Sequence, residues 1–125
     1  IHSLSHPVGA IYNTHHGLTN AVFMPYVLER NREAIEDKIS AVARYLDLDS
    51  LSFDGFLEWV LDIRKELKIP HTLKELINDD TKLEEMSKMA LNDPSTAGNP
   101  VNLTQEDFLI LYKNSYEGRL LKKNE

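Results

Sequence analysis

Four of the five histidines lie within the first sixteen residues, at positions 2, 6, 15 and 16. His2 and His6 are four residues apart, so in a helix their rings would share one face about one turn apart. A turn at residues 13–17 would bring His15 or His16 back toward this pair. Neutral imidazole suits Fe(II), Zn(II) and other borderline metals, whereas calcium and magnesium prefer oxygen ligands. The cluster therefore indicates a metal site, with packed or surface roles for single histidines as the alternative.

The N-terminal segment does not contain a full set of metal ligands. No Asp or Glu precedes Glu29, although a bound metal usually takes three or four ligands from a protein. The chain also begins at Ile1, within the histidine cluster and without an initiator Met. We therefore expect a piece of a longer protein, in which upstream residues supply the missing ligands.

The composition is typical of a soluble globular protein. The chain has 125 residues, of which 42% are hydrophobic and 27% are charged, as expected for one domain with one core. A net charge of -6 argues against nucleic acid as a partner. Dispersed basic residues argue against an anionic membrane surface, and no apolar run approaches the ~20 residues that span a bilayer. The absence of cysteine excludes disulfides and is compatible with a cytoplasmic protein.

Apolar residues recur at spacings of three and four, which predicts an all-α bundle of about six helices. We expect Pro7 and Gly9 to interrupt the first helix. The other expected helices cover residues 19–31, 33–45, 52–67, 79–91 and 104 onward, with a short turn at 72–77 and a loop at 92–100. One apolar stripe and one aromatic group are spaced like core residues, and we expect His71 to be a surface or capping residue. The stripe is Ile35, Ile39, Val42, Ala43 and Leu46, and the aromatic group, with one aliphatic neighbour, is Phe53, Phe56, Trp59 and Val60.

The segment from His2 to Pro25 resembles the histidine-rich signature of the iron-containing (group III) alcohol dehydrogenases. The family pattern is H-x-x-x-H-P-L-G-A, a short turn, P-H-G-x-x-N-A, an apolar pair and a proline. This chain departs from it at Val8, which replaces Leu, and at His15, which replaces a common Pro. A later Asp and Asn-Pro resemble a second family feature, although Val101 stands where many relatives have Arg. The matching residues are His2, His6, Pro7, Gly9, Ala10, His16, Gly17, Asn20, Ala21 and Pro25, then Asp93, Asn99 and Pro100.

The resemblance implies a domain organisation. Residues 1–125 would form the single C-terminal helical domain of a dehydroquinate synthase-like two-domain enzyme. An upstream Rossmann-like domain, absent from this chain, would hold most of the NAD or NADP. The complete enzyme would be a homo-oligomer that interconverts primary alcohols and aldehydes, and this chain alone would be inactive.

The resemblance also implies roles for the histidines. Family members bind one divalent metal through one Asp and three His. His2 and His16 match the two ligands from this domain, and Fe²⁺ is the expected ion, with Zn²⁺ as the alternative. His6 matches a histidine beside the metal and close to the nicotinamide, so its expected roles are catalytic and cofactor-binding. His15 is a further imidazole that could compete as a metal ligand.

Two other interpretations of the sequence stay open. The first is a freestanding helical interaction module, whose histidines bind metal incidentally or not at all. The second keeps the enzyme but makes it a zinc-dependent relative of glycerol dehydrogenase. Imidazole and carboxylate ligands do not separate iron from zinc sharply.

Overall fold

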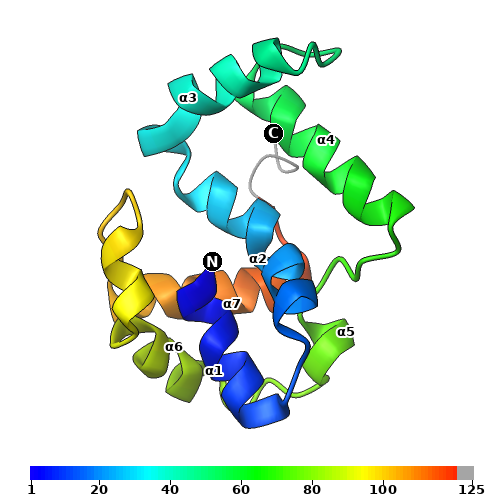
Figure 1. Ribbon diagram of the computed structural model, residues 1–125. Helices are drawn as coiled ribbons and strands as arrows, with labels where there is room; N and C mark the ends of the chain where they lie inside the picture. The colour runs from blue at the N-terminus through cyan, green and yellow to red at the C-terminus, as the bar shows by residue number, and fades with distance from the viewer. Residues whose placement is uncertain (121–125) are drawn as a thin grey trace.

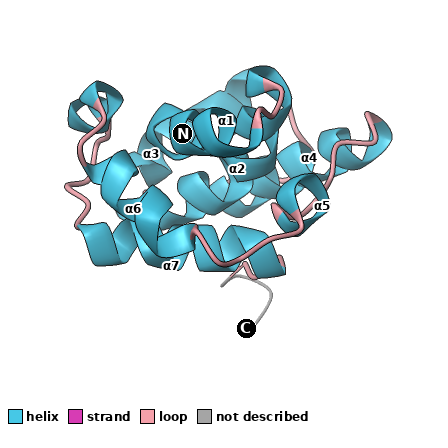
Figure 2. Ribbon diagram, turned by 90° about the horizontal axis from the view of Figure 1, so that it is seen from below, coloured by secondary structure: helices cyan, strands magenta, loops and turns pink. Residues whose placement is uncertain are grey.

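The computed structural model describes residues 1–120, and every regular element in that range is helical (Figures 1 and 2). The predicted all-α class is confirmed. No helix in the described range is long and apolar enough to cross a bilayer. The elements are α1 (His2–Tyr12), α2 (His16–Arg30), α3 (Arg32–Tyr45), α4 (Phe53–Glu66), α5 (Lys74–Ile77), α6 (Leu83–Leu91), the 3-10 helix η1 (Pro94–Gly98) and α7 (Gln105–Glu117).

The main core lies among α1, α2, α6 and α7. Helix α6 packs against α7 and α1, and α2 packs against α1 and α7. At its centre the Phe23 and Tyr112 rings meet edge to face, with centroids 5.7 Å apart. The Tyr112 hydroxyl donates a 2.7 Å hydrogen bond to the Leu4 carbonyl, which ties α7 to α1.

Helices α3 and α4 form an arm at one end of α2, at the top of Figure 1. A second, smaller core of Ala43, Phe56 and Val60 joins them. The predicted burial of the α3 stripe is largely wrong, because Ala43 is its one buried residue and Val42 is 39% exposed. Trp59 is 37% exposed rather than a core residue. Besides α4, the contacts of α3 are mainly with the end of α2, so one pair of helices cannot cover the whole stripe.

Side-chain caps confirm the predicted starts of α4 and α7. Ser52 accepts a hydrogen bond from the Gly55 N–H at the start of α4. Thr104 and Asp107 form a capping box at the start of α7. Helix α6 begins later than predicted, at Leu83, because the Asp79 carboxylate accepts the Thr81 N–H and closes a separate turn first.

The predicted interruption of α1 is wrong, since the helix runs unbroken from His2 to Tyr12 with Pro7 inside it. A proline inside a helix removes one backbone hydrogen bond and crowds the carbonyl four residues before it, although its fixed φ suits a helix. Pro7 is fully buried, so tertiary packing offsets the lost hydrogen bond. The helix ends at Asn13, which adopts a left-handed φ of 55° and donates its N–H to the Gly9 carbonyl. His2 and His6 therefore share a face of one continuous helix.

His71 is half-buried between α4 and α5, which differs from its predicted surface role. The Tyr26 hydroxyl donates a 2.7 Å hydrogen bond to the His71 carbonyl. Arg64, only 5% exposed, donates to the carbonyls of Val22, Pro70 and His71. Burial raises the pKa of Tyr26 to about 12, against a smaller opposing effect of Arg64. These contacts fix the segment after α4 against α2.

Candidate metal centre

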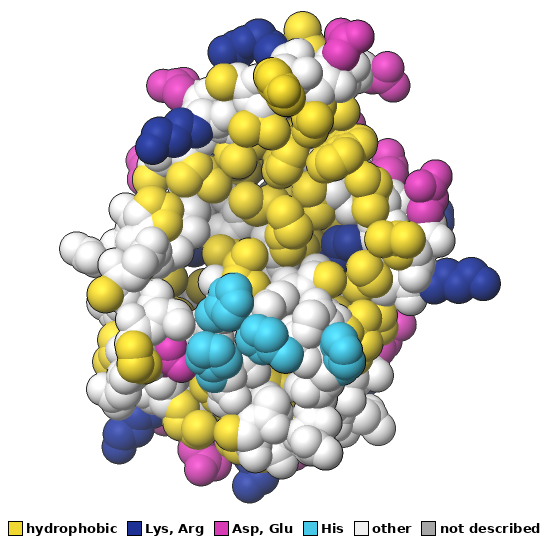
Figure 3. Space-filling model, viewed as in Figure 1, with side chains coloured by type: hydrophobic (Ala, Val, Ile, Leu, Met, Phe, Trp, Pro, Cys, Tyr) yellow, Lys and Arg dark blue, Asp and Glu magenta, His cyan; other side chains and the backbone are white. Residues whose placement is uncertain are grey.

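The rings of His2, His6 and His16 converge on one face of the molecule. Their centroids are 5.1 Å apart for His2 and His16, 5.5 Å for His6 and His16, and 5.8 Å for His2 and His6. All three residues are exposed. Figure 3 shows histidine side chains gathered on one face, below a broad apolar surface. The structure thus brings together the three histidines that the sequence singled out.

The turn between α1 and α2 produces this convergence. The left-handed Asn13 ends α1, and extended backbone at His15 starts α2 in a new direction. Buried Thr19 fastens the turn, because its hydroxyl donates to the His15 carbonyl at 2.7 Å and also meets the Thr14 hydroxyl. Since α1 then packs on α2, His16 lies beside the His2 and His6 face.

His15 caps α2. Its Nδ1 accepts a 3.2 Å hydrogen bond from the Leu18 N–H, as an N-cap side chain does. Helix α2 therefore begins at His16, three residues earlier than predicted, with His15 as its cap. That hydrogen bond occupies one of the two ring nitrogens of His15. Metal ligation by His15 stays a prediction, and helix capping is the alternative role that the geometry supports.

We expect the His15→Ala change to lower the free energy of unfolding by about 0.5–2 kcal/mol, because it removes the cap. Urea denaturation measures this difference. His15→Asn is the matched control, since Asn also caps helices well and should restore most of the stability. Neither change should weaken metal binding, and a tenfold loss of metal affinity in both variants would identify His15 as a ligand instead.

His6 lies within hydrogen-bond distance of Asp93, which precedes η1. The His6 Nδ1 lies 2.7 Å from Asp93 Oδ2, and the Asp93 side chain is only 12% exposed. The other oxygen, Oδ1, accepts the Ser95 N–H at 2.8 Å. Burial raises the pKa of Asp93, but hydrogen bonds from Ser95 and His6 outweigh it and hold the pKa below its usual value. The sequence showed Asp93 only as part of a resemblance and gave no signal of this contact.

A second chain of hydrogen bonds supports His16. The Ser5 hydroxyl donates to Asn20 Oδ1, which directs the Asn20 amide nitrogen to His16 Nε2 at 3.1 Å. An amide N–H can only donate, so this contact describes a neutral imidazole. That donation uses the lone pair of Nε2, so a metal ion would bind His16 through Nδ1, or through Nε2 only after Asn20 moves away.

His2 and His16 fit a divalent metal as part of a larger ligand set. Two imidazoles on one tetrahedral ion have ring centres roughly 5 Å apart, and the observed separation is 5.1 Å. Within residues 1–120, however, no three His, Cys, Asp or Glu side chains are arranged to hold a metal ion by themselves. A metal ion bound by this pair would therefore need further ligands.

The loop that carries Asp93 is braced on both sides. The Thr96 hydroxyl lies 2.6 Å from the Ala90 carbonyl and 2.8 Å from the Ser3 hydroxyl, which joins η1 to α1. Asn31 and Asn99 exchange two amide hydrogen bonds, of 2.8 Å and 3.0 Å, at the joint between α2 and α3. Asn31 is buried, so this pair is shielded from water.

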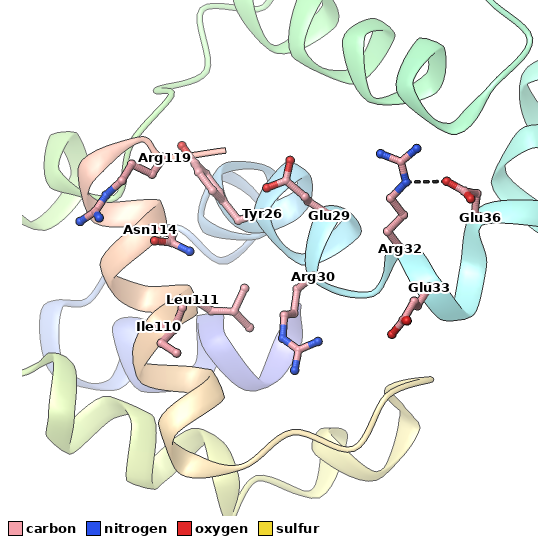
Figure 4. A pocket seen from close by; sticks show the side chains of 10 residues that line it. All are labelled: Tyr26, Glu29, Arg30, Arg32, Glu33, Glu36, Ile110, Leu111, Asn114 and Arg119. Atoms are coloured by element: carbon pink, nitrogen blue, oxygen red, sulfur yellow. Dashed lines mark hydrogen bonds and ion pairs between the residues drawn. The ribbon is translucent and has the colours of Figure 1, made fainter. Parts of the chain in front are cut away.

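Two cavities lie near these elements. A cavity of about 220 Å³ adjoins His2 between α1 and η1, and Leu4, Ser95 and Asn99 contribute to its walls. A larger cavity of about 550 Å³ lies between α7 and the joint of α2 and α3 (Figure 4). Its wall includes the paired charges Arg32 and Glu36 and contains no histidine. The larger cavity is therefore separate from the candidate metal centre.

Comparison with known proteins adds a decisive observation. Residues 1–116 match the sequence pattern of the Fe-containing alcohol dehydrogenase family, C-terminal part. The chain belongs to this family. It is 30% identical over 122 residues to the lactaldehyde reductase of Escherichia coli (strain K12), covering 93% of the chain and 32% of the reductase. It is 35% identical over 120 residues to an alcohol dehydrogenase of Thermococcus barophilus, covering 92% of the chain and 30% of that protein.

Solved structures agree with this Fe-containing alcohol dehydrogenase assignment. The iron-containing alcohol dehydrogenase from Thermococcus thioreducens matches with a TM-score of 0.83 and 31% identity, over 94% of this chain and 32% of that one. A 1,3-propanediol oxidoreductase, at 23% identity, shares the fold with a TM-score of 0.86, over 92% of this chain and 32% of that chain. The predicted C-terminal helical domain is confirmed, and the chain spans about a third of the length of these relatives.

Proposed function

We propose that this chain is the metal-binding domain of an iron-dependent, NAD(P)-linked alcohol dehydrogenase that interconverts primary alcohols and aldehydes. The observation that carries the proposal is the His2–His16 pair at 5.1 Å, with His6 stacked beside it at 5.5 Å. Family membership supports it, as do relatives named lactaldehyde reductase and NADPH-dependent butanol dehydrogenase, the latter from Clostridium saccharobutylicum. Cytoplasmic location and homo-oligomeric assembly stay predictions.

His2 and His16 would hold the metal together with an Asp and a third His from an upstream domain that also binds the nucleotide. When bound, the metal acts as a Lewis acid that polarises the substrate oxygen. The cavity of about 220 Å³ beside His2 is below the usual range for drug-sized ligands, which fits a small alcohol or aldehyde. His6 lies outside the ligand pair, and its role is to move the hydroxyl proton and to contact the nicotinamide side of the site.

Titration of the 125-residue chain with Fe(II) or Zn(II) in a calorimeter, without oxygen for iron, tests the ligand assignment. We expect weak binding that the His2→Ala, His16→Ala double change abolishes, and no dehydrogenase activity from the chain alone. His15→Ala, next to His16, is the matched control and should leave the binding intact. Tight binding that survives the double change would show that the ligands are misassigned. No metal binding, together with a specific protein complex, would favour the interaction module.

A further inference from the structure

The contact between His6 and Asp93 determines which ring nitrogen of His6 carries a hydrogen. Asp93 Oδ2 lies 2.7 Å from Nδ1, and Oδ1 is already engaged by the Ser95 N–H at 2.8 Å. An ionised carboxylate only accepts hydrogen bonds, so Nδ1 must be the donor. In a neutral imidazole with its hydrogen on Nδ1, Nε2 holds the free lone pair.

Asp93 is held firmly enough to keep the hydrogen of His6 on Nδ1. Its two oxygens have different partners, the His6 ring and the backbone of η1. The loop itself is attached to α1 through Thr96 and Ser3 and to α6 through the Ala90 carbonyl. Movement of the carboxylate away from His6 would break the cap of η1 as well, so the pair is orientated by contacts that do not involve the metal centre.

We propose that Asp93 is a positioning residue, which holds His6 with its hydrogen on Nδ1 and so leaves Nε2 as the proton acceptor of the reaction. The Nδ1–H tautomer of His6 follows from the geometry alone, whereas the role of Nε2 as proton acceptor rests on the function proposed above. In the oxidative direction, the hydroxyl proton of the alcohol moves to Nε2 and then to bulk water, which returns His6 to its neutral form. A carboxylate that holds a histidine base in one tautomer is also found in the Ser-His-Asp triad.

The Asp93→Asn change tests the tautomer of His6. Both carboxylate oxygens of Asp93 accept hydrogen bonds, whereas the amide of Asn has one accepting oxygen and one donating nitrogen. If the amide oxygen retains the Ser95 N–H, the amide nitrogen replaces Oδ2 and faces His6 as a donor. The hydrogen of His6 must then move to Nε2. Nitrogen NMR shifts of the chain, measured at about pH 8.5 where ordinary imidazoles are neutral, report the tautomer directly.

The expected result is Nδ1–H in the unaltered chain, Nε2–H in Asp93→Asn and a mixture in Asp93→Ala. Asp79→Asn is the matched control, because Asp79 also binds a loop N–H and a side chain of α1, here the Tyr12 hydroxyl. It should leave His6 unchanged. Unaltered Nδ1–H in both Asp93 variants would overturn the proposal.

Measuring kcat of the complete enzyme, beside the tautomer of His6, distinguishes a failure of this inference from a failure of the proposed function. We expect Asp93→Asn to lower kcat about 10–100-fold, as for other supporting residues, with little change in KM. A reversed tautomer with unchanged kcat would retain the positioning by Asp93 and overturn the catalytic role of His6. An unchanged tautomer with a lowered kcat would overturn the positioning and leave the role of His6 intact.

Discussion

In the complete enzyme, the His16→Ala change should lower kcat/KM by roughly a thousandfold. The metal supplies several kcal/mol of charge stabilisation at the substrate oxygen, and about 4 kcal/mol corresponds to a factor of a thousand. His16 is one of only two metal ligands that we assign to this domain, and no neighbouring Asp or Glu precedes Glu29 to replace it. Steady-state kinetics with a primary alcohol, combined with metal analysis of the purified protein, measures both effects.

Two other changes give this prediction its controls. His15→Ala alters the adjacent residue. It should lower the free energy of unfolding but leave the metal content and kcat/KM unchanged. His6→Ala should lower the rate by about 10²–10⁴-fold, the usual contribution of a general acid or base, while the metal content stays normal. A His16→Ala enzyme that retains its metal and its rate would contradict the ligand assignment, whatever the behaviour of His6.

The second large effect concerns the core. We expect Tyr112→Ala to lower the free energy of unfolding by about 3–5 kcal/mol, as for other large aromatic residues removed from a core. Tyr112 is fully buried, packs edge to face on Phe23, and donates to the Leu4 carbonyl. Chemical denaturation followed by circular dichroism gives the difference in the free energy of unfolding.

Tyr112→Phe separates the hydrogen bond from the packing. This change keeps the ring and removes one hydrogen bond to the Leu4 carbonyl, which keeps its partner within α1, so we expect a loss of about 0.5–1.5 kcal/mol. Equal losses for the Phe and Ala variants would show that the ring contributes little, contrary to the packing seen at Phe23. Since α1 carries His2 and His6, the Phe variant should also loosen the metal centre.

Local signals in the sequence were enough to predict the fold class and most helix boundaries. Ser52 and the Thr104–Asp107 capping box act within one helical turn of themselves, so their partners are predictable from spacing. The shared face of His2 and His6 is predictable in the same way, because the two residues are one helical turn apart. The sequence offered either His15 or His16 as the third histidine, and the resemblance selected His16, whose return to that face depends on a turn of three residues.

Contacts that depend on distant parts of the chain were not predictable. The spacing of Pro7 indicated a helix break, yet packing around a buried proline keeps α1 intact. The periodicity of α3 indicated a buried stripe, but periodicity does not say whether a partner helix exists to cover it. Asp93 lies 87 residues from His6, and no local pattern links two side chains over that separation.

The long separations around the metal centre have a consequence for synthesis. His6 is joined to Asp93 across 87 residues, Ser3 to Thr96 across 93, and Leu4 to Tyr112 across 108. Contacts of such sequence separation form late, since the closure of long loops must precede them. During synthesis from the N-terminus, His2, His6 and His16 are made early, but His6 gains its contact with Asp93 and α1 its contact with Tyr112 only after those distant residues have left the ribosome. The nascent chain therefore passes most of its elongation without an organised site to capture metal.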